Sequence, residues 1–325
     1  MSSLKSKSFP PPTRRAALAS LLGLGALAQA GHAWAQRPVL RIGYQKAANT
    51  LVLLKTKGTL EKRLAPLGVD VKWAEFAAGP QLLEALNVGS VDFGYVGEVP
   101  PVVAQAAGAD FVYVAYEVPS PEAEGILVPA HSPLKTVADL KGKKIAFNKG
   151  SDVHWLVVSA LKKAGIAYGD FSPVYLPPAD ARAAFEKGAI DAWAVWDPFQ
   201  TAAQKQIGAR RLASAAGIVP RHQFFLAARP FAQAHGDVLK AVLEEASREG
   251  QWILGNYNEA ARQLSAVQGL EVDVIETALK NYKHVYKPIE PGVLAQQQRI
   301  ADAFHELRLI PRPIRVGDAV VAARP

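Results

Sequence analysis

Two loops of this 325-residue chain are rich in hydrogen-bond donors. One loop holds Gln45, Lys46 and Asn49, and the other holds Ser151 and His154. Their amide, ammonium, hydroxyl and imidazole groups can all donate to an oxyanion. Both loops also contain small residues, which let backbone N–H groups approach a ligand closely. We therefore predict that the two loops bind a small anion together, although Lys46 is also consistent with a solvated surface lysine.

No catalytic or metal-binding pattern accompanies these donors. The sequence contains no G-x-S-x-G elbow, no H-E-x-x-H pair, no Walker loop and no G-x-G-x-x-G after a strand. The seven histidines are scattered, and none pairs with another at the spacing of metal ligands. The absence of cysteine excludes disulfides, thiolate metal sites and a Cys nucleophile. We predict a binding protein without a metal or cofactor, not an enzyme.

The elements that must position these loops alternate between strands and helices. This alternation predicts an α/β fold with parallel sheets and helices on both faces. In the first part of the chain, strands are predicted at residues 39–44, 69–76 and 91–96, and helices at residues 51–64 and from Gly79 onward.

The sequence repeats part of itself about 100 residues later. Residues 39–46 match residues 142–149, and residues 86–92 match residues 185–191. The matched aspartates Asp92 and Asp191 are expected to position turns. Repetition of an α/β unit predicts two similar lobes, with the ligand beyond the carboxyl ends of their strands.

We expect the chain to cross from one lobe to the other at residues 119–124 and to return through a strand at residues 223–228. The predicted division is therefore residues 36–122 for the first part of lobe 1, 123–224 for lobe 2, and 225–325 for the completion of lobe 1 with the C-terminal helices. Trp193 and Trp196 differ in strand parity, so one should lie in the core while the other forms an apolar wall.

Residues 1–35 have the order of a secretory signal peptide. Four basic residues and no acidic residue accompany an apolar run at 16–30 and an Ala-Trp-Ala cleavage pattern at 33–35. The run is shorter than the roughly 20 residues that span a bilayer, which argues against a membrane anchor. Arg14 and Arg15 also fit a degenerate twin-arginine signal, so the export route stays open. We predict an exported, soluble protein.

The charge of the chain gives no indication of nucleic-acid binding. Its formal net charge of +8 includes the four basic residues of the predicted signal. The remaining basic residues are spread out, apart from Lys141, Lys143 and Lys144, which are expected in a solvated turn. A small positive excess suits a small anionic ligand.

Several motifs, taken in order, resemble one family. The segments are Arg41-Ile42-Gly43-Tyr44-Gln45-Lys46, Ala77-Ala78-Gly79-Pro80-Gln81, Leu86 to Asp92, Gln105 to Asp110, Lys149-Gly150-Ser151 with His154, and Trp196-Asp197-Pro198. Together they resemble the periplasmic aliphatic sulfonate-binding proteins of ABC importers, within the wider sulfonate, nitrate and taurine group. The likeness covers nearly the whole chain after the signal and weakens after about Arg229.

This resemblance implies a type II periplasmic binding protein with two Rossmann-like α/β lobes and a hinged cleft between them. It implies capture of an alkanesulfonate by a monomer that delivers it to a membrane permease and its ATPase for sulfur acquisition. The positions that match family ligand contacts are Gln45, Lys46, Ala48, Asn49, Ala78, Gly79, Pro80, Gln81, Gly97, Glu98, Ser151, Asp152, His154, Trp196 and Asp197.

Two departures from the family pattern leave the exact ligand open. Ala47-Ala48-Asn49 stands where the family has Gly and a small hydroxyl residue, and Asp152 stands where a second Ser is common. A carboxylate near an anion costs affinity unless it faces solvent or meets a positive group on the ligand. Taurine, a sulfate ester, nitrate and a neutral pyrimidine precursor therefore remain alternative ligands.

Overall fold

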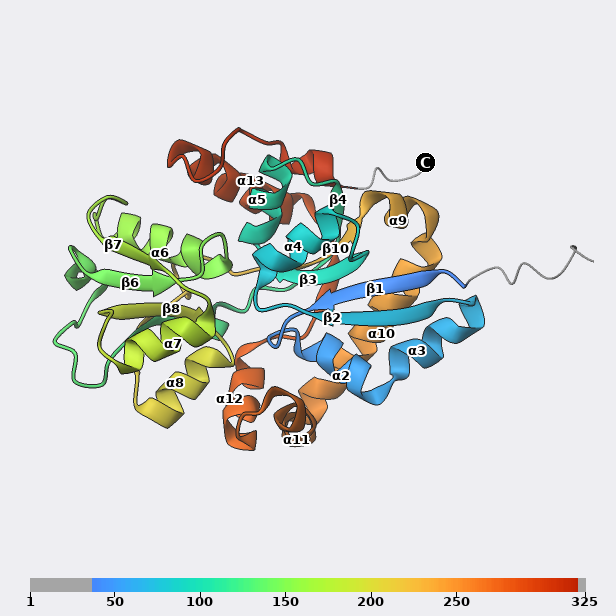
Figure 1. The fold of residues 1–325 in the computed structure, drawn as a ribbon, viewed down its shortest axis with the longest axis horizontal. Helices are drawn as coiled ribbons and strands as arrows, with labels where there is room; N and C mark the ends of the chain where they lie inside the picture. Colours follow the sequence, from blue (N-terminus) through green and yellow to red (C-terminus); the bar gives the residue numbers. More distant parts are fainter. Residues whose placement is uncertain (1–36, 321–325) are drawn as a thin grey trace, which may run out of the picture. The chain divides into compact units, whose positions relative to one another are not determined.

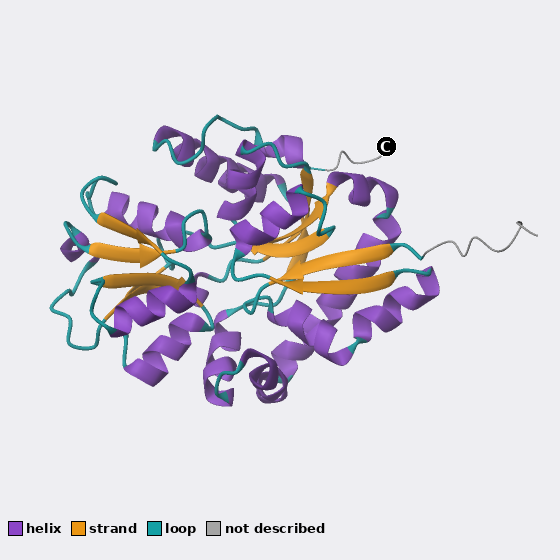
Figure 2. Cartoon of the chain, in the orientation of Figure 1, coloured by secondary structure: helices purple, strands orange, loops and turns teal. Residues whose placement is uncertain are grey.

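The computed structural model describes residues 37–320, whose strands form two separate sheets (Figures 1 and 2). The predicted signal peptide at residues 1–35 lies outside the described residues. Among the residues that are described, no helix is long and apolar enough to cross a membrane.

The first sheet has the strand order β11-β4-β10-β3-β1-β2. Its strands are β1 (Val39–Tyr44), β2 (Asp70–Glu75), β3 (Phe93–Gly97), β4 (Phe111–Glu117), β10 (Gln223–Ala228) and β11 (Tyr286–Pro288). Strands β2 and β3 run parallel to β1, whereas β10 is antiparallel to both β3 and β4.

The second sheet has the order β7-β6-β8-β5-β9. Its strands are β5 (Glu124–Val128), β6 (Lys144–Phe147), β7 (Ser172–Tyr175), β8 (Ala192–Trp196) and β9 (Arg210–Ser214). Strand β5 is antiparallel to both of its neighbours. The sheets are therefore mixed and not parallel throughout, because β5 and β10 each enter directly from the other sheet and β11 is antiparallel to β4.

The internal repeat is visible in the topology. The order β2-β1-β3-β10-β4 of the first sheet corresponds to β7-β6-β8-β5-β9 of the second. The matched aspartates also do the same work: Asp92 Oδ2 accepts from the Arg41 N–H at 2.9 Å, and Asp191 Oδ2 accepts from the Lys144 N–H at 2.8 Å. Both aspartates therefore hold the backbone of a neighbouring strand, β1 or β6, whereas a turn was expected.

Helices cover both faces of each sheet. The helices are α2 (Asn49–Lys57), α3 (Thr59–Leu64), α4 (Gly79–Asn87), α5 (Val99–Ala106), α6 (Asp152–Lys163), α7 (Pro178–Glu186), α8 (Phe199–Ile207), α9 (Arg229–Ala234), α10 (Gly236–Gly255), α11 (Tyr257–Gln268), α12 (Val272–Asn281) and α13 (Pro291–Glu306). The single helix expected at 51–64 is two helices, because Gly58 has a φ of 62° and donates its N–H to Lys55 O, ending α2.

Alternation along the strands divides the core. Phe93 and Tyr95 of β3 face a cluster that contains side chains of α2 and α10, while Val96 faces a cluster from α4, α5 and α13. In the second sheet, Trp193 faces the α7 and α8 side and Trp196 faces the α6 side. The prediction that these two tryptophans lie on opposite faces is confirmed.

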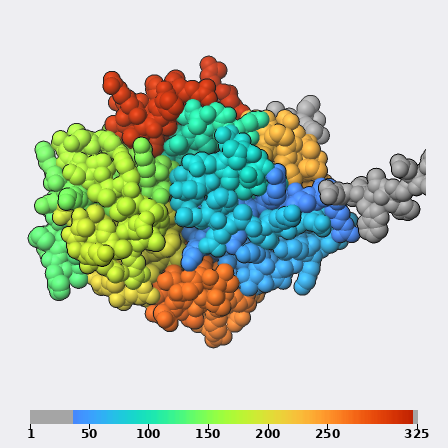
Figure 3. All heavy atoms as spheres, in the orientation of Figure 1, coloured from blue at the N-terminus to red at the C-terminus, as the bar shows by residue number. Residues whose placement is uncertain are grey.

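Two chain segments, residues 118–123 and 215–222, connect the sheets. They lie side by side, since the Ser120 N–H donates to Arg221 O at 3.2 Å. A second contact joins α8 to α12, where Lys205 Nζ lies 3.0 Å from Asp273 Oδ2 (Figure 3, yellow against orange).

Candidate functional site

A small pocket lies where the ends of β1, β3 and β8 meet the entrance of β10. Its volume is about 20 Å³. Residues of both sheets contribute to its lining: Gln45, Ala47, Ala48, Gly79, Tyr95, Gly97, Pro100, Ser151, Asp152, Trp196, Arg221 and Gln223. The pocket therefore lies at the carboxyl ends of parallel strands, where α/β folds bind ligands.

Four helices begin at this pocket: α2, α4, α5 and α6. None of the four has a side chain that hydrogen-bonds as its N-cap. A helix N-terminus carries a partial positive charge and usually unpaired N–H groups, which together favour an anion. In α5 the charge acts without free N–H groups at residues 99–101, because Val99 donates to Asp152 and Pro100 and Pro101 have no N–H. The pocket therefore has anion-binding character before any charged side chain is counted.

Two buried polar side chains complete this donor set. Gln45 donates one N–H to Tyr95 O at 3.2 Å and keeps a second N–H. Ser151 donates its hydroxyl to Asn148 O at 2.7 Å, which fixes the loop before α6. Gln45 is thus free to contact a ligand, while Ser151 contributes through the position of its loop, since its N–H also donates to Asn148 O at 3.3 Å.

Arg221 is the cation of the pocket, and sequence reasoning missed it. The residue is only 1% exposed and has a φ of 58°. Its Nε lies 3.3 Å from Glu124 Oε2, and its Nη2 lies 3.5 Å from the Tyr282 hydroxyl. Its Nη1 is buried and has no hydrogen-bond partner within residues 37–320. Burial would lower its pKa, but Tyr282, Glu124 and Asp152 together raise it, so Arg221 stays charged.

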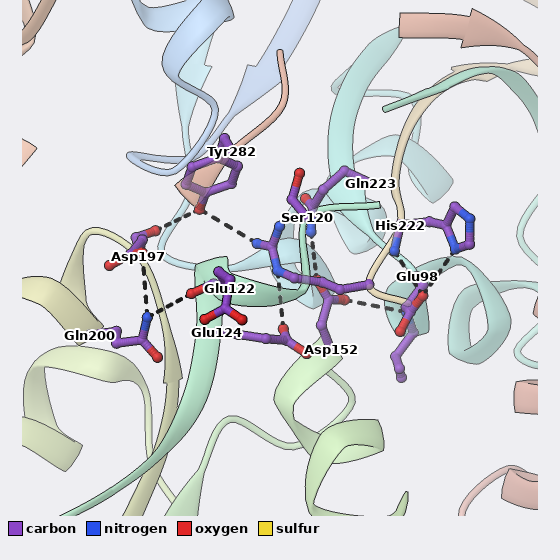
Figure 4. A network of polar contacts seen from close by, with 12 residues as sticks. Glu98, Ser120, Glu122, Glu124, Asp152, Asp197, Gln200, His222, Gln223 and Tyr282 are labelled. Carbon is purple, nitrogen blue, oxygen red and sulfur yellow. Dashed lines mark hydrogen bonds and ion pairs between the residues drawn. The ribbon is translucent and has the colours of Figure 1, made fainter. Parts of the chain in front are cut away.

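Two buried carboxylates, Glu124 and Asp152, act on this one guanidinium. A third, Glu98, lies beside His222 and acts on the other two carboxylates (Figure 4). Asp152 Oδ2 accepts from Gln223 Nε2 at 2.7 Å, and its Oδ1 lies 3.4 Å from the Val99 N–H. Burial raises the pKa of Asp152 to about 6, against the opposing effect of Arg221. Burial also raises the pKa of Glu124 well above its ordinary value, again opposed by Arg221.

An outer cavity of about 370 Å³ adjoins the inner pocket and shares Gln45, Ala47 and Trp196 with it. Its remaining lining is mostly apolar, with Lys46 and Glu75 as the charged members: Phe76, Ala77, Pro177, Pro178, Ala179 and Phe199. The arrangement can hold a ligand with a polar head in the inner pocket and an apolar tail outside it.

The structure brings about half of the predicted ligand positions to the inner pocket: Gln45, Ala48, Gly79, Gly97, Ser151, Asp152 and Trp196. Lys46 lines the outer cavity, where its Nζ donates to Gln268 O at 3.2 Å. Asn49 lines a separate cavity of about 10 Å³, and its Oδ1 accepts from Gln268 Nε2 at 3.3 Å.

The other predicted positions lie outside both cavities. Ala78 packs in the apolar core next to β6, and Pro80 and Gln81 continue α4, with Gln81 exposed. Glu98 is buried, and its Oε2 accepts from the His222 N–H at 3.0 Å.

His154 and Asp197 also lie outside both cavities. In His154, Nδ1 accepts from the Gly150 N–H at 3.2 Å and Nε2 lies 2.6 Å from the Tyr168 hydroxyl. Burial lowers the pKa of His154 to about 4, and Lys149 adds to the shift.

Both carboxylate oxygens of Asp197 accept hydrogen bonds from within the protein. Its Oδ1 accepts from the Thr201 N–H at 2.9 Å and its Oδ2 from Asn281 Nδ2 at 2.7 Å, while its backbone oxygen accepts from the Tyr282 hydroxyl at 2.8 Å (Figure 4). This acid therefore ties the end of β8 to α12.

Besides Arg221, the sequence reasoning did not single out Tyr95, Pro100 or Gln223 as pocket residues. A signal for Arg221 and Gln223 was present: they stand at the entrance of the predicted return strand. Because β10 is antiparallel to β3, its entrance lies at the same edge as the exit of β3, and Gln223 pairs with Gly97. The direction of the return strand was not predicted, so its entrance was not placed at the pocket.

Comparison with known proteins decides the family. The NMT1-like family model matches residues 35–268. A protein of Escherichia coli (strain K12) named for the binding of aliphatic sulfonates is 45% identical over 305 residues, which cover 94% of each chain. The chain belongs to the aliphatic sulfonate-binding proteins of the NMT1-like family.

Two solved structures of this family share the fold. The alkanesulfonate-binding protein SsuA from Xanthomonas axonopodis pv. citri, bound to MOPS, is 44% identical, with a TM-score of 0.83 over 88% of this chain and 98% of that one. The periplasmic aliphatic sulphonate-binding protein SsuA from Escherichia coli is 46% identical, with a TM-score of 0.81 over 87% and 97%. The resemblance and the periplasmic-binding-protein fold predicted from the motifs are confirmed. As a member of this family, the chain is a binding protein rather than an enzyme.

Proposed function

We propose that this chain captures aliphatic sulfonates in the periplasm, after loss of residues 1–35, and delivers them as a monomer to an ABC permease and its ATPase. The observation that carries the proposal is the 44–46% identity with aliphatic sulfonate-binding proteins over nearly the whole chain. The pocket supports it independently, since its helix N-termini and Arg221 favour a single compact anion.

The sulfonate head would occupy the inner pocket. Gln45, the Gly79 N–H and Arg221 Nη1 are the donors that can meet its oxygens, since the N–H groups of Ala48 and Ser151 already donate to Gln45 O and Asn148 O. An uncharged isostere would leave these buried donors unpaired, so it should bind far more weakly.

The alkyl tail would extend along Trp196 into the outer cavity. Each buried methylene contributes about 0.8 kcal/mol at most, so selectivity for chain length should be soft. Lys46 and Glu75 lie at this cavity and can meet polar substituents on the tail.

Capture would proceed by closure of two lobes, with boundaries at residues 36–122, 123–224 and 225–325, except that Gln223 and Phe224 pair with β3 and therefore belong with the first lobe. Each lobe has its own sheet, and the paired segments 118–123 and 215–222 form the hinge. Because the pocket is lined from both sheets, a ligand there makes more contacts when the lobes approach than when they separate, and it favours closure for that reason.

Taurine is the second candidate ligand, and Asp152 is the observation that favours it. A carboxylate that lines an anion pocket can accept from the ammonium group of a zwitterion.

Isothermal titration of the mature protein, freed of bound ligand by refolding, tests the assignment. The panel contains ethane- to octanesulfonate, taurine, sulfate, nitrate and a pyrimidine. Micromolar binding of several alkanesulfonates, with sulfate and nitrate silent, is the expected result. A response to taurine, nitrate or the pyrimidine alone would retain the fold and reassign the ligand.

A further inference from the structure

The position of Asp152 is unexpected for an acidic residue in a protein that binds anions. Asp152 lines the proposed sulfonate pocket, and it also bridges the two lobes, from the first turn of α6 to Val99 and Gln223 on the other side. Gly97 lies so close to it that a methyl group there would overlap the carboxylate. The carboxylate is therefore enclosed whenever the lobes are as close as in this structure.

The charged groups around Asp152 do not neutralise its negative charge. They come from Arg221 in the segment before β10, from Glu98 at the start of α5, and from Glu124 at the start of β5. His222 lies beside Glu98, with its Nδ1 3.6 Å from Glu98 Oε2. One guanidinium, already paired with Glu124, thus faces two buried carboxylates, and Glu98 adds a third negative group near both of them.

A bound sulfonate would add another negative charge to this group. Alkanesulfonates are anions of strong acids and do not take up protons at pH 5 to 8. A proton taken up by the protein would offset the added charge, and Asp152 is the carboxyl that lines the same pocket as the sulfonate.

We propose that sulfonate binding by this chain takes up a proton, and that the Asp152 carboxyl group receives it. The protonated carboxyl can still accept from the Val99 N–H, and it can donate to Gln223 once that amide reverses. The inference rests on the proposed function, and it explains how an anion receptor tolerates an acid in its pocket.

The direction in which the affinity for sulfonate changes with pH follows from the burial of the Asp152 carboxyl. Burial raises the pKa of Asp152 from 3.8 to about 6 when the lobes are together. The closed form therefore holds the proton more tightly than an open form with a solvated carboxyl, and binding strengthens as pH falls through 6. If the open form has the ordinary value, affinity should be about tenfold tighter at pH 5 than at pH 7, with uptake of close to one proton at pH 5.

The experiment is titration of the mature protein with ethanesulfonate between pH 5 and 8. Each pH uses two buffers of different ionisation enthalpy, and sulfonate buffers such as MOPS are avoided because they would compete. The difference in heat between the buffers gives the number of protons taken up. Proton uptake that rises toward pH 5, together with tighter binding, is the expected result.

Variants assign the proton to its site. Asp152→Asn should lose the proton uptake and bind more tightly than the wild type at pH 7, and Asp152→Ser should likewise lose the proton uptake. His222→Gln is the matched control, since it removes the other titratable group near Glu98 and should retain the uptake.

Two outcomes would overturn the inference: ethanesulfonate binding whose affinity and heat show no proton exchange, or proton uptake that persists in Asp152→Asn and disappears in His222→Gln. Neither result would touch the proposed function, which fails only if no sulfonate binds at any pH.

Discussion

Gly97 at the end of β3 offers a direct test of lobe closure. A Cβ atom at this position would fall well inside 3.0 Å of Oδ1, Oδ2 and Cγ of Asp152, across the interface between the lobes. In Gly97→Ala the carboxylate must withdraw, or the lobes must stop short of the arrangement seen here. The substitution should therefore weaken ligand binding without disturbing either lobe by itself.

The size of the effect follows from the contacts that are lost. Withdrawal of Asp152 breaks its hydrogen bond to Gln223 Nε2, at 2.7 Å, and the longer one to the Val99 N–H, at 3.4 Å. A hydrogen bond to a charged group contributes about 1.5–3 kcal/mol, and the longer one contributes little. Loss of about 2 kcal/mol lowers the affinity for an alkanesulfonate roughly 30-fold.

Isothermal titration measures the affinity, and small-angle scattering measures whether saturating ligand still compacts the protein. Gly292→Ala in the first turn of α13 is the control, because no heavy atom lies within 4 Å of a Cβ there. Asp152→Ala in the Gly97→Ala background removes the overlapping atoms and should restore compaction. Binding by Gly97→Ala within about threefold of the wild type would refute the closure geometry.

Three further outcomes are expected. Arg221→Gln should abolish sulfonate binding and lower the free energy of unfolding by about 3–5 kcal/mol, because it leaves Glu124 buried without its partner, and adding Glu124→Gln should recover part of that stability in urea titrations; an unchanged unfolding midpoint would contradict the pairing. Trp196→Ala should flatten the gain in affinity from ethane- to octanesulfonate while ethanesulfonate binding changes little, and a parallel loss across the series would place the tail elsewhere. Burial lowers the pKa of His154 from 6.5 to about 4, so the unfolded chain takes up a proton at this residue before the folded chain does. The wild type should therefore lose about 2 kcal/mol of unfolding free energy from this group between pH 7 and pH 5. His154→Gln should reduce that loss, and an equal dependence of unfolding free energy on pH in both proteins would exclude this role of His154.

Much of the fold could be predicted from local patterns. The return strand at 223–228 is β10 itself, and Gly79-Pro80 opens α4, because Pro is well suited to the first turn of a helix. The matched aspartates act in both sheets as the repeat implies. Strand direction was not accessible in this way, since an antiparallel return strand carries the same apolar residues as a parallel one.

The candidate site could likewise be predicted where it depends on local patterns, and could not where it depends on contacts between distant segments. The loops that meet at the pocket could be predicted, because each follows a predicted strand. Glu98 and Asp197 occupy matching places in the sequence, yet both carboxylates are used by their own surroundings. For Asp197 a local signal existed, because Thr201 is one helical turn away and its N–H needs an acceptor. The pairing of Arg221 with Glu124 had no local signal, since it joins two residues 97 positions apart in the sequence.

The position of β10 has a consequence for the order in which the protein assembles. The second sheet uses one continuous stretch of chain, from Glu124 to Ser214, whereas β10 fills the gap between β3 and β4 of the first sheet. Until residue 228 is available, β3 and β4 each present an unpaired edge. Contacts that are close in sequence form faster, so the second sheet should acquire structure first, in pulse-labelled hydrogen exchange as well as during synthesis. The sheet that the chain enters first is thus the last to be completed.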